Sequence, residues 1–286
     1  MKSYLVPKKY NYYYKSLDNN SGVKFLKEQI NSIEQYKIDL LEKYRTFLQS
    51  SSDLVEPMAI VNDIKQFIIE RKRAEKNLYR AYNIASKGAR GEDKVKDIIY
   101  TFDNEWHVIS NARLNIEGNN IENDFVIIDE SGISTIEVKN IGSSSEKLII
   151  DKLGRVKRVS RFNEEIETVD IISQGNRHLG YLKRFIDKNI DYKVPVNSYI
   201  VIASNIRIIN KSDFNIIGPN QIYNIIKAQP RVIDTDKVEE VYNLIYDNLI
   251  EGHKYQYVDY ISVLEENYKL ILLSIKEYLE SKKKNL

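Results

Sequence analysis

The segment ENDFVIIDESGISTIEVKNI, residues 122–141, constrains the fold most strongly. Two runs rich in Ile, Val and Phe flank a short Asp-Glu-Ser-Gly turn, which predicts two antiparallel strands of one sheet. Because side chains alternate between the faces of a strand, Glu137 and Lys139 share one face and Ile136 and Val138 share the other. Taken alone, such a charged pair is typical of the solvated face of an antiparallel sheet.

The elements around this hairpin predict an α/β fold. A helical pattern begins after Gly88, and the segment WHVISNA at 106–112 predicts a strand. A second hairpin is predicted at 147–160, followed by an amphipathic helix at 169–187 and an apolar strand at 197–204. The order helix, three strands, hairpin, helix and strand indicates an α/β sandwich around a mixed central sheet.

Helices with a heptad apolar seam are predicted on both sides of the α/β segment. Two such series, at 26–47 and 60–85, are separated by the turn QSSSDLVEP and predict an N-terminal helical hairpin. Further helices are expected at about 219–228, 237–249 and 257–279. The last could pack against the hairpin or pair with a second copy, so a homo-oligomer formed through the helical flanks is one expectation.

These patterns divide the chain into three expected segments. Residues 1–86 form a coiled-coil-like helical hairpin, 87–210 an α/β domain and 211–286 a C-terminal helical region. Lys37 and Arg71 interrupt the two N-terminal seams at about the same level. Either nearby glutamates or a bound anion would neutralise two facing cations, or both side chains extend outward from the helices.

Composition supports a folded protein and limits its metal chemistry. Apolar residues make up 42% of the 286 residues, enough for a buried core. The chain has no cysteine and three scattered histidines, so any metal would be held by oxygen ligands.

No apolar run approaches the roughly 18 residues of a membrane span, and we expect a soluble, cytoplasmic protein without membrane contact. A net charge of +2 says little about nucleic acid binding.

Polar side chains are predicted to converge beside Glu137 and Lys139. Asp124 opens the preceding strand, and antiparallel pairing brings the start of that strand beside the end of the next. Glu92 ends a mostly apolar helical stripe that should face the sheet, and Gln174 lies on the later helix. Three carboxylates, one lysine and one amide therefore form a candidate site.

Four short motifs resemble the nuclease-related domain (NERD) family and occur in the order of that family. They are GARGE at 88–92, ENDFVII at 122–128, IEVKN at 136–140 and Gln174 within SQGNRHLGYL. The resemblance covers about residues 87–205 and neither helical flank. This family belongs to the PD-(D/E)xK nuclease superfamily, so the resemblance implies a restriction-endonuclease-like αβββαβ core with a mixed central sheet.

Carried onto this sequence, the resemblance implies a site for a divalent cation. Asp124 and Glu137 would be ligands of Mg²⁺, with the Val138 carbonyl as a third oxygen. Lys139 would orient or help deprotonate the attacking water and offset charge on the phosphate. Mg²⁺ prefers hard oxygen ligands and keeps several waters, and Mn²⁺ should substitute for it.

Two further site residues follow from the same resemblance. Glu92 would be a helix-borne acidic ligand, and Gln174 would position metal, water or DNA. From the residues alone, Glu92 could equally be a first-turn carboxylate favoured by the helix dipole, and Gln174 a surface amide. The superfamily's proline is absent before Asp124, where Asn123 stands instead.

Basic side chains flank the candidate site in sequence and form a candidate DNA-binding set. Such residues could track a phosphate backbone without reading sequence, or they could form an ordinary solvated charged face. The residues concerned are Arg155, Lys157, Arg158, Arg161, Arg177, His178, Lys183 and Arg184.

The resemblance implies a Mg²⁺-dependent DNA nuclease that hydrolyses phosphodiester bonds as an endonuclease or exonuclease. DNA repair and defence against foreign DNA are both compatible settings. The alternative is a non-catalytic nucleic-acid-binding or scaffolding protein that retains the nuclease fold. A third hypothesis is a helical adaptor in which the α/β domain is purely structural.

Overall fold

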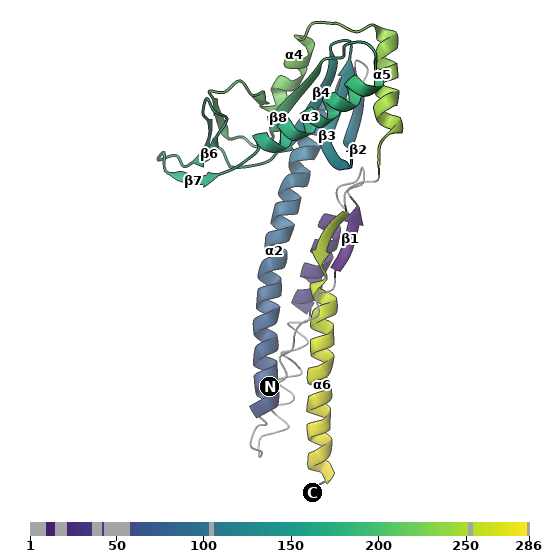
Figure 1. Cartoon of the computed structure of the whole chain (residues 1–286). Coiled ribbons are helices and arrows are strands. Elements are labelled where there is room, and N and C mark those ends of the chain that lie inside the picture. The colour runs from purple at the N-terminus through teal and green to yellow at the C-terminus, as the bar shows by residue number, and fades with distance from the viewer. Residues whose placement is uncertain are drawn as a thin grey trace. The chain divides into compact units, whose positions relative to one another are not determined.

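A computed structural model describes residues 10–14, 22–35, 42, 58–102, 106–250 and 254–284 (Figure 1). Packing divides the chain into two compact units. One contains the helical residues before Lys87 and the residues from Lys254 onward, and the other contains Lys87–His253. Helix α2 (Met58–Tyr100) contributes residues to both.

The first unit is helical. It combines helical residues 22–35, the first part of α2 and helix α6 (Tyr260–Lys284). A two-stranded sheet of β1 (Tyr10–Tyr14) and β11 (Lys254–Val258) accompanies them. The buried core is made by Leu26, Ile30, Ile33, Ile60, Ile64, Phe67, Ala74, Leu78, Leu264, Tyr268 and Ile271.

These core residues are the apolar positions of the predicted heptad seams. Helix α6 packs against the N-terminal helical residues, which is one of the two arrangements expected from the sequence. Arg71 is buried within its seam, where its Nη1 lies 3.0 Å from Glu75 Oε2 one turn further on. The charge of Arg71 is therefore neutralised by a glutamate of the same helix. Lys37 lies outside the described residues.

Helix α2 differs from the prediction, because the sequence indicated separate helices before and after Gly88. The structure has one helix of 43 residues, with Gly88 and Gly91 in its interior. Glycine lowers helix stability by about 1 kcal/mol per residue, but α2 contains no proline that would force a break. Packing against the sheet is sufficient to carry the helix through both glycines.

The second unit is built on a mixed sheet with strand order β10-β8-β4-β3-β2. Strands β2, β3 and β4 pair antiparallel, whereas β4, β8 and β10 pair parallel. Their bounds are β2 His107–Ile116, β3 Asn119–Asp129, β4 Gly132–Lys139, β8 Val196–Ile202 and β10 Ile216–Ile217.

Helices cover both faces of this sheet (Figure 1). The end of α2 and helix α4 (Ile222–Lys227), which follows the 3-10 helix η2 (Pro219–Gln221), pack on one face. Helices α3 (Ile172–Asn189) and α5 (Thr235–Asp247) pack on the other. The predicted α/β class with a mixed sheet and flanking helices is confirmed.

A second sheet of four strands lies beside the first, in the order β7-β6-β5-β9. The sequence predicted the hairpin of β5 (Lys147–Ile150) and β6 (Val156–Val159), but not β7 (Glu165–Thr168) or β9 (Arg207–Asn210). Both missed strands are four residues long and lie at sheet edges. Strands this short carry little periodicity for prediction.

Among the described helices, none combines the length and the apolar character needed to cross a membrane.

Candidate functional site

The register of β3 and β4 brings Asp124 beside Glu137. Phe125 pairs with Ile136, and Asp124 and Glu137 are the next residues outward from this pair. Their side chains point to the face that carries α3, because Phe125 and Ile136 belong to the core on the opposite face. Both carboxylates are largely buried, with exposed fractions of 8% for Asp124 and 6% for Glu137.

A hydrogen bond from β4 fixes the Asp124 carboxylate. The backbone N–H of Val138 donates to Asp124 Oδ2 at 2.7 Å. The N–H and C=O of one strand residue point toward the same edge, so the Val138 carbonyl also points toward β3. The next carbonyl, that of Lys139, points the other way and accepts from the N–H of Ala203 at 2.9 Å.

Lys139 joins the strand pair to helix α3. Its ammonium donates to Glu137 Oε1 at 2.5 Å and to Gln174 Oε1 at 3.0 Å. The Lys139 side chain is still partly exposed, whereas that of Glu137 is buried. The structure thus brings together four of the predicted site residues, namely Asp124, Glu137, Lys139 and Gln174.

His178 lies one turn after Gln174 on α3 and is buried. Its Nδ1 is 4.0 Å from Glu137 Oε2 and has no hydrogen-bond partner. Burial is the main cause that lowers the pKa of His178, and the charge of Arg177 adds to the effect. Both the lowered pKa and the 4.0 Å separation favour a neutral imidazole that packs beside the carboxylate.

Gly91 determines how closely α2 approaches the site. A Cβ at this position would lie 2.6 Å from Cβ of Asn140, the residue after Lys139. The Asn140 amide donates to the Lys87 carbonyl of α2 at 2.7 Å, which holds the helix against the end of β4. The contact of Asn140 with α2 could not be predicted from the sequence, because no local signal marks a partner 53 residues away in the chain.

Glu92 follows Gly91 and is partly buried. Helix α2 packs on the sheet face opposite to α3. Among the described residues, no three His, Cys, Asp or Glu side chains are arranged as a metal-ligand group. The role of Glu92 in the site stays a prediction.

The donor set at this strand edge fits a hard divalent cation. Two buried carboxylates, Asp124 and Glu137, and the carbonyl of Val138 offer oxygen atoms from adjacent strands. Mg²⁺ prefers oxygen ligands and fills its remaining positions with water. Asp124, Glu137 and Val138 are therefore the candidate ligands for such a cation.

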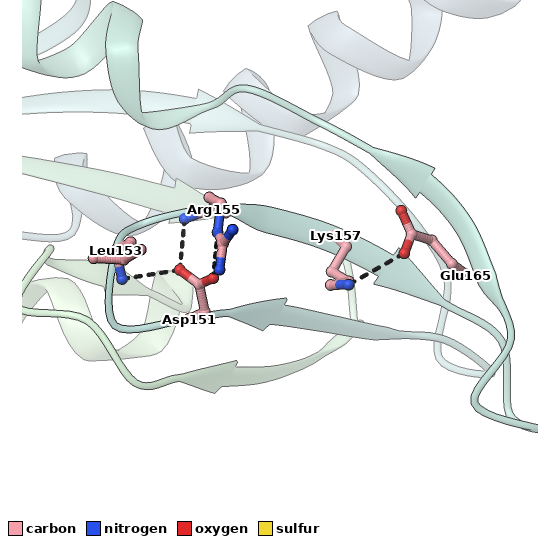
Figure 2. Close-up of polar contacts among 5 residues, drawn as sticks. All are labelled: Asp151, Leu153, Arg155, Lys157 and Glu165. Carbon is pink, nitrogen blue, oxygen red and sulfur yellow. Dashed lines mark hydrogen bonds and ion pairs between the residues drawn. The ribbon is translucent and has the colours of Figure 1, made fainter.

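Two of the basic residues expected to bind DNA are paired with acidic side chains in the second sheet (Figure 2). Arg155 Nε lies 2.6 Å from Asp151 Oδ2, and Lys157 Nζ lies 3.2 Å from Glu165 Oε2. The pKa of the Asp151 carboxyl is lowered by hydrogen bonds, chiefly from the backbone of Arg155. That of Glu165 is lowered chiefly by a hydrogen bond from Thr168, with Lys157 adding to it.

Arg158 is paired as well, whereas Arg161 is arranged differently. Arg158 lies 3.0 Å from both Glu146 and Glu167 and is partly buried. The guanidinium of Arg161 lies over the ring of Phe162, 4.6 Å from its centroid. Three of the four cations in this basic run are therefore neutralised inside their own sheet.

The basic residues of α3 are less constrained. Arg177 and Lys183 are exposed. Arg184 lies 3.4 Å from Glu117 and stacks over the ring of Tyr181 at 4.5 Å.

A pocket of ≈ 510 Å³ lies at the opposite end of the central sheet, lined in part by Trp106, Asp129 and Arg231. Asp129 is at the far end of β3 from Asp124, about 17 Å away at the usual rise of a strand. This pocket is separate from the candidate site.

The fold and site define an α/β domain with two buried carboxylates, Asp124 in the middle of β3 and Glu137 near the end of β4, and a lysine at the end of β4. Residues 87–203 match the family described as the nuclease-related domain. The resemblance that the four motifs indicated is therefore confirmed over these residues. No curated protein and no solved structure matches the chain.

Proposed function

We propose that this domain hydrolyses phosphodiester bonds of DNA with Mg²⁺ as cofactor. Its core would be the αβββαβ unit of α2, β2, β3, β4, α3 and β8. The observation that carries the proposal is the contact of Lys139 with Glu137 and Gln174 beside the buried Asp124, inside a nuclease-related domain. DNA repair or defence against foreign DNA would be suitable settings for such an activity.

Each residue of the site would have a separate role in hydrolysis. Bound Mg²⁺ would neutralise phosphate charge and lower the pKa of a water that can attack phosphorus. Asp124, Glu137 and the Val138 carbonyl would hold the cation, and Glu92 would add a carboxylate from α2. Lys139 would bind a phosphate oxygen and hold the attacking water, while Gln174 keeps the ammonium in place.

Cleavage of plasmid and linear duplex DNA in Mg²⁺, Mn²⁺ or EDTA tests this function. We expect cleavage with either metal and none in EDTA. Glu137→Ala removes a ligand and Lys139→Ala removes the charge beside the phosphate, so each should lower the rate by about 100-fold or more. The matched controls Glu239→Ala on α5 and Lys188→Ala on α3 alter exposed residues outside the site and should retain the rate. Cleavage that survives Glu137→Ala and Lys139→Ala would refute the proposal.

A non-catalytic nucleic-acid-binding protein is the second candidate. One observation favours it. The described residues include no group of three His, Cys, Asp or Glu side chains arranged to hold a metal ion. This alternative predicts salt-sensitive DNA binding that is unchanged by EDTA and by Asp124→Asn, with no cleavage in any metal. Binding by gel shift, measured beside the cleavage assay, separates the two.

A further inference from the structure

The turn between β6 and β7, residues 160–164, is held by its own polar groups. Ser160 Oγ accepts hydrogen bonds from the backbone N–H of Phe162 at 3.1 Å and of Glu164 at 3.3 Å. Asn163 adopts a φ of 65°, a left-handed conformation that asparagine tolerates better than most residues. Its side chain accepts from Lys147 Nζ on β5 at 2.7 Å. The turn therefore has a fixed shape that is anchored to the neighbouring strands.

This turn presents an aromatic side chain to solvent. Phe162 is 69% exposed, so most of its ring is accessible to a partner. The Arg161 guanidinium lies 4.6 Å from the ring centroid and covers part of one face. An aromatic ring with an arginine beside it is the combination that stacks on nucleobases and attracts their phosphates.

The turn lies at the end of the second sheet that adjoins the candidate site. Val159, the last residue of β6, pairs with Lys147, and Lys147 also pairs with Arg207, the first residue of β9. Only a short link separates Arg207 from Ala203, whose N–H bonds to the Lys139 carbonyl. A nucleic acid that contacts both Lys139 and Phe162 would therefore have to extend across β9, β5 and β6.

In the second sheet, the pairing of basic residues with carboxylates favours contacts with nucleic-acid bases over contacts with phosphates. Arg155, Lys157 and Arg158 are each paired with a carboxylate, and a phosphate would have to compete with those carboxylates. Arg161, with its guanidinium over an aromatic ring, is the remaining cation of the run. Stacking on an aromatic ring needs an unpaired base, because bases in a duplex already stack on one another.

We propose that the turn at 160–164 binds unpaired bases of single-stranded nucleic acid, with Phe162 as the stacking platform and Arg161 as its cationic neighbour. The proposal rests on the nucleic-acid function proposed above, and it names single-stranded DNA, or the unpaired end of a duplex, as the preferred substrate.

Fluorescence anisotropy with labelled DNA in EDTA tests this, since it measures binding without cleavage. The full-length protein would be titrated with an oligothymidylate, a duplex and an abasic oligonucleotide of equal length. We expect the oligothymidylate to bind more tightly than the other two. Phe162→Ala should weaken its binding about tenfold, and Phe162→Trp should restore it. The salt dependence should stay the same in both variants, because no charge is removed.

Leu153→Ala is the matched control, since Leu153 is 78% exposed at the other turn of the same sheet and should not affect binding. The inference is overturned if Phe162→Ala binds as tightly as wild type, or if the abasic strand binds as well as the oligothymidylate. It is also overturned if Phe162→Ala changes only the oligomeric state, which would make the turn a protein contact. If Phe162→Ala leaves both DNA binding and metal-dependent duplex cleavage unchanged, this inference fails and the nuclease function proposed above is retained.

Discussion

The Lys139 ammonium is held by two oxygen acceptors before any substrate arrives. Glu137 Oε1 lies 2.5 Å from it and Gln174 Oε1 lies 3.0 Å from it. Ordering a lysine side chain costs conformational entropy, and here that cost is met when the protein folds rather than when it binds substrate. A phosphate or water entering the site would therefore meet a positioned charge.

Tyr192 provides a residue-scale prediction for alkaline pH. Burial, together with the hydrogen bond to Glu240 at 3.0 Å, raises the pKa of Tyr192 to about 12. The folded pKa lies above the unfolded value of about 10, so this group contributes stability that is present below pH ~10. That contribution is lost as the pH rises through about 12, because the unfolded chain releases the proton more easily.

Urea unfolding between about pH 9 and about pH 11.5 measures this effect. The wild-type protein should lose stability steeply over this interval, and Tyr192→Phe should lose less because it has no proton to release. Tyr246→Phe, an exposed position on α5, serves as the control and should follow wild type. If the free energy of unfolding falls equally with pH in wild type and in Tyr192→Phe, Tyr192 is not the group responsible.

At the scale of elements, the contact of α2 with β4 depends on the absence of a side chain at Gly91. Gly91→Ala would place a Cβ 2.6 Å from Cβ of Asn140, so the helix must shift away from the strand. We expect a loss of about 1–3 kcal/mol in the free energy of unfolding, together with slower cleavage. Thermal unfolding by circular dichroism and the plasmid assay measure the two effects.

Gly88→Ala is the matched control for that helix. A Cβ at Gly88 would have no neighbour within 4 Å, and alanine is a better helix former than glycine. This substitution should therefore stabilise the protein, by about 0.5–1 kcal/mol. If both substitutions stabilise it, the close approach at Gly91 does not constrain the helix.

Some elements of the fold could be predicted from sequence patterns and others could not. Strands β3 and β4 were predictable, because a long alternating pattern and a turn motif specify a hairpin locally. The continuity of α2 through two glycines was not, because helix propensity alone favours a break and only packing on the sheet offsets it. The pairing of Arg155 with Asp151 was also missed, since it depends on the shape of the β5–β6 turn.

For the whole molecule, the division into two separately packed units predicts that a destabilising substitution in one unit leaves the other unit folded. Phe67 is fully buried in the helical unit, and Phe67→Ala should cost that unit about 3–5 kcal/mol. Unfolding followed by circular dichroism should then show an early helical transition. The α/β unit has its own cores, so it should keep the cleavage activity proposed above at temperatures below its own transition.

Ile69→Ala is the control for this prediction, because Ile69 is exposed on the same helix and its truncation should change stability by less than about 0.5 kcal/mol. A single unfolding transition that shifts as a whole in Phe67→Ala, with activity lost at the same temperature, would mean that the two units unfold together.

The local features of this protein follow from its amino-acid sequence. Strand alternation put Glu137 and Lys139 on one face, antiparallel pairing put Asp124 beside them, and heptad spacing marked the helical core. The partners of these residues depend on tertiary packing. Gln174 is 35 residues from Lys139 in the chain, and Asn140 is 53 residues from Lys87. Such contacts depend on how helices pack across a sheet, which no local pattern encodes, whereas alternation and pairing follow from backbone geometry within a few residues.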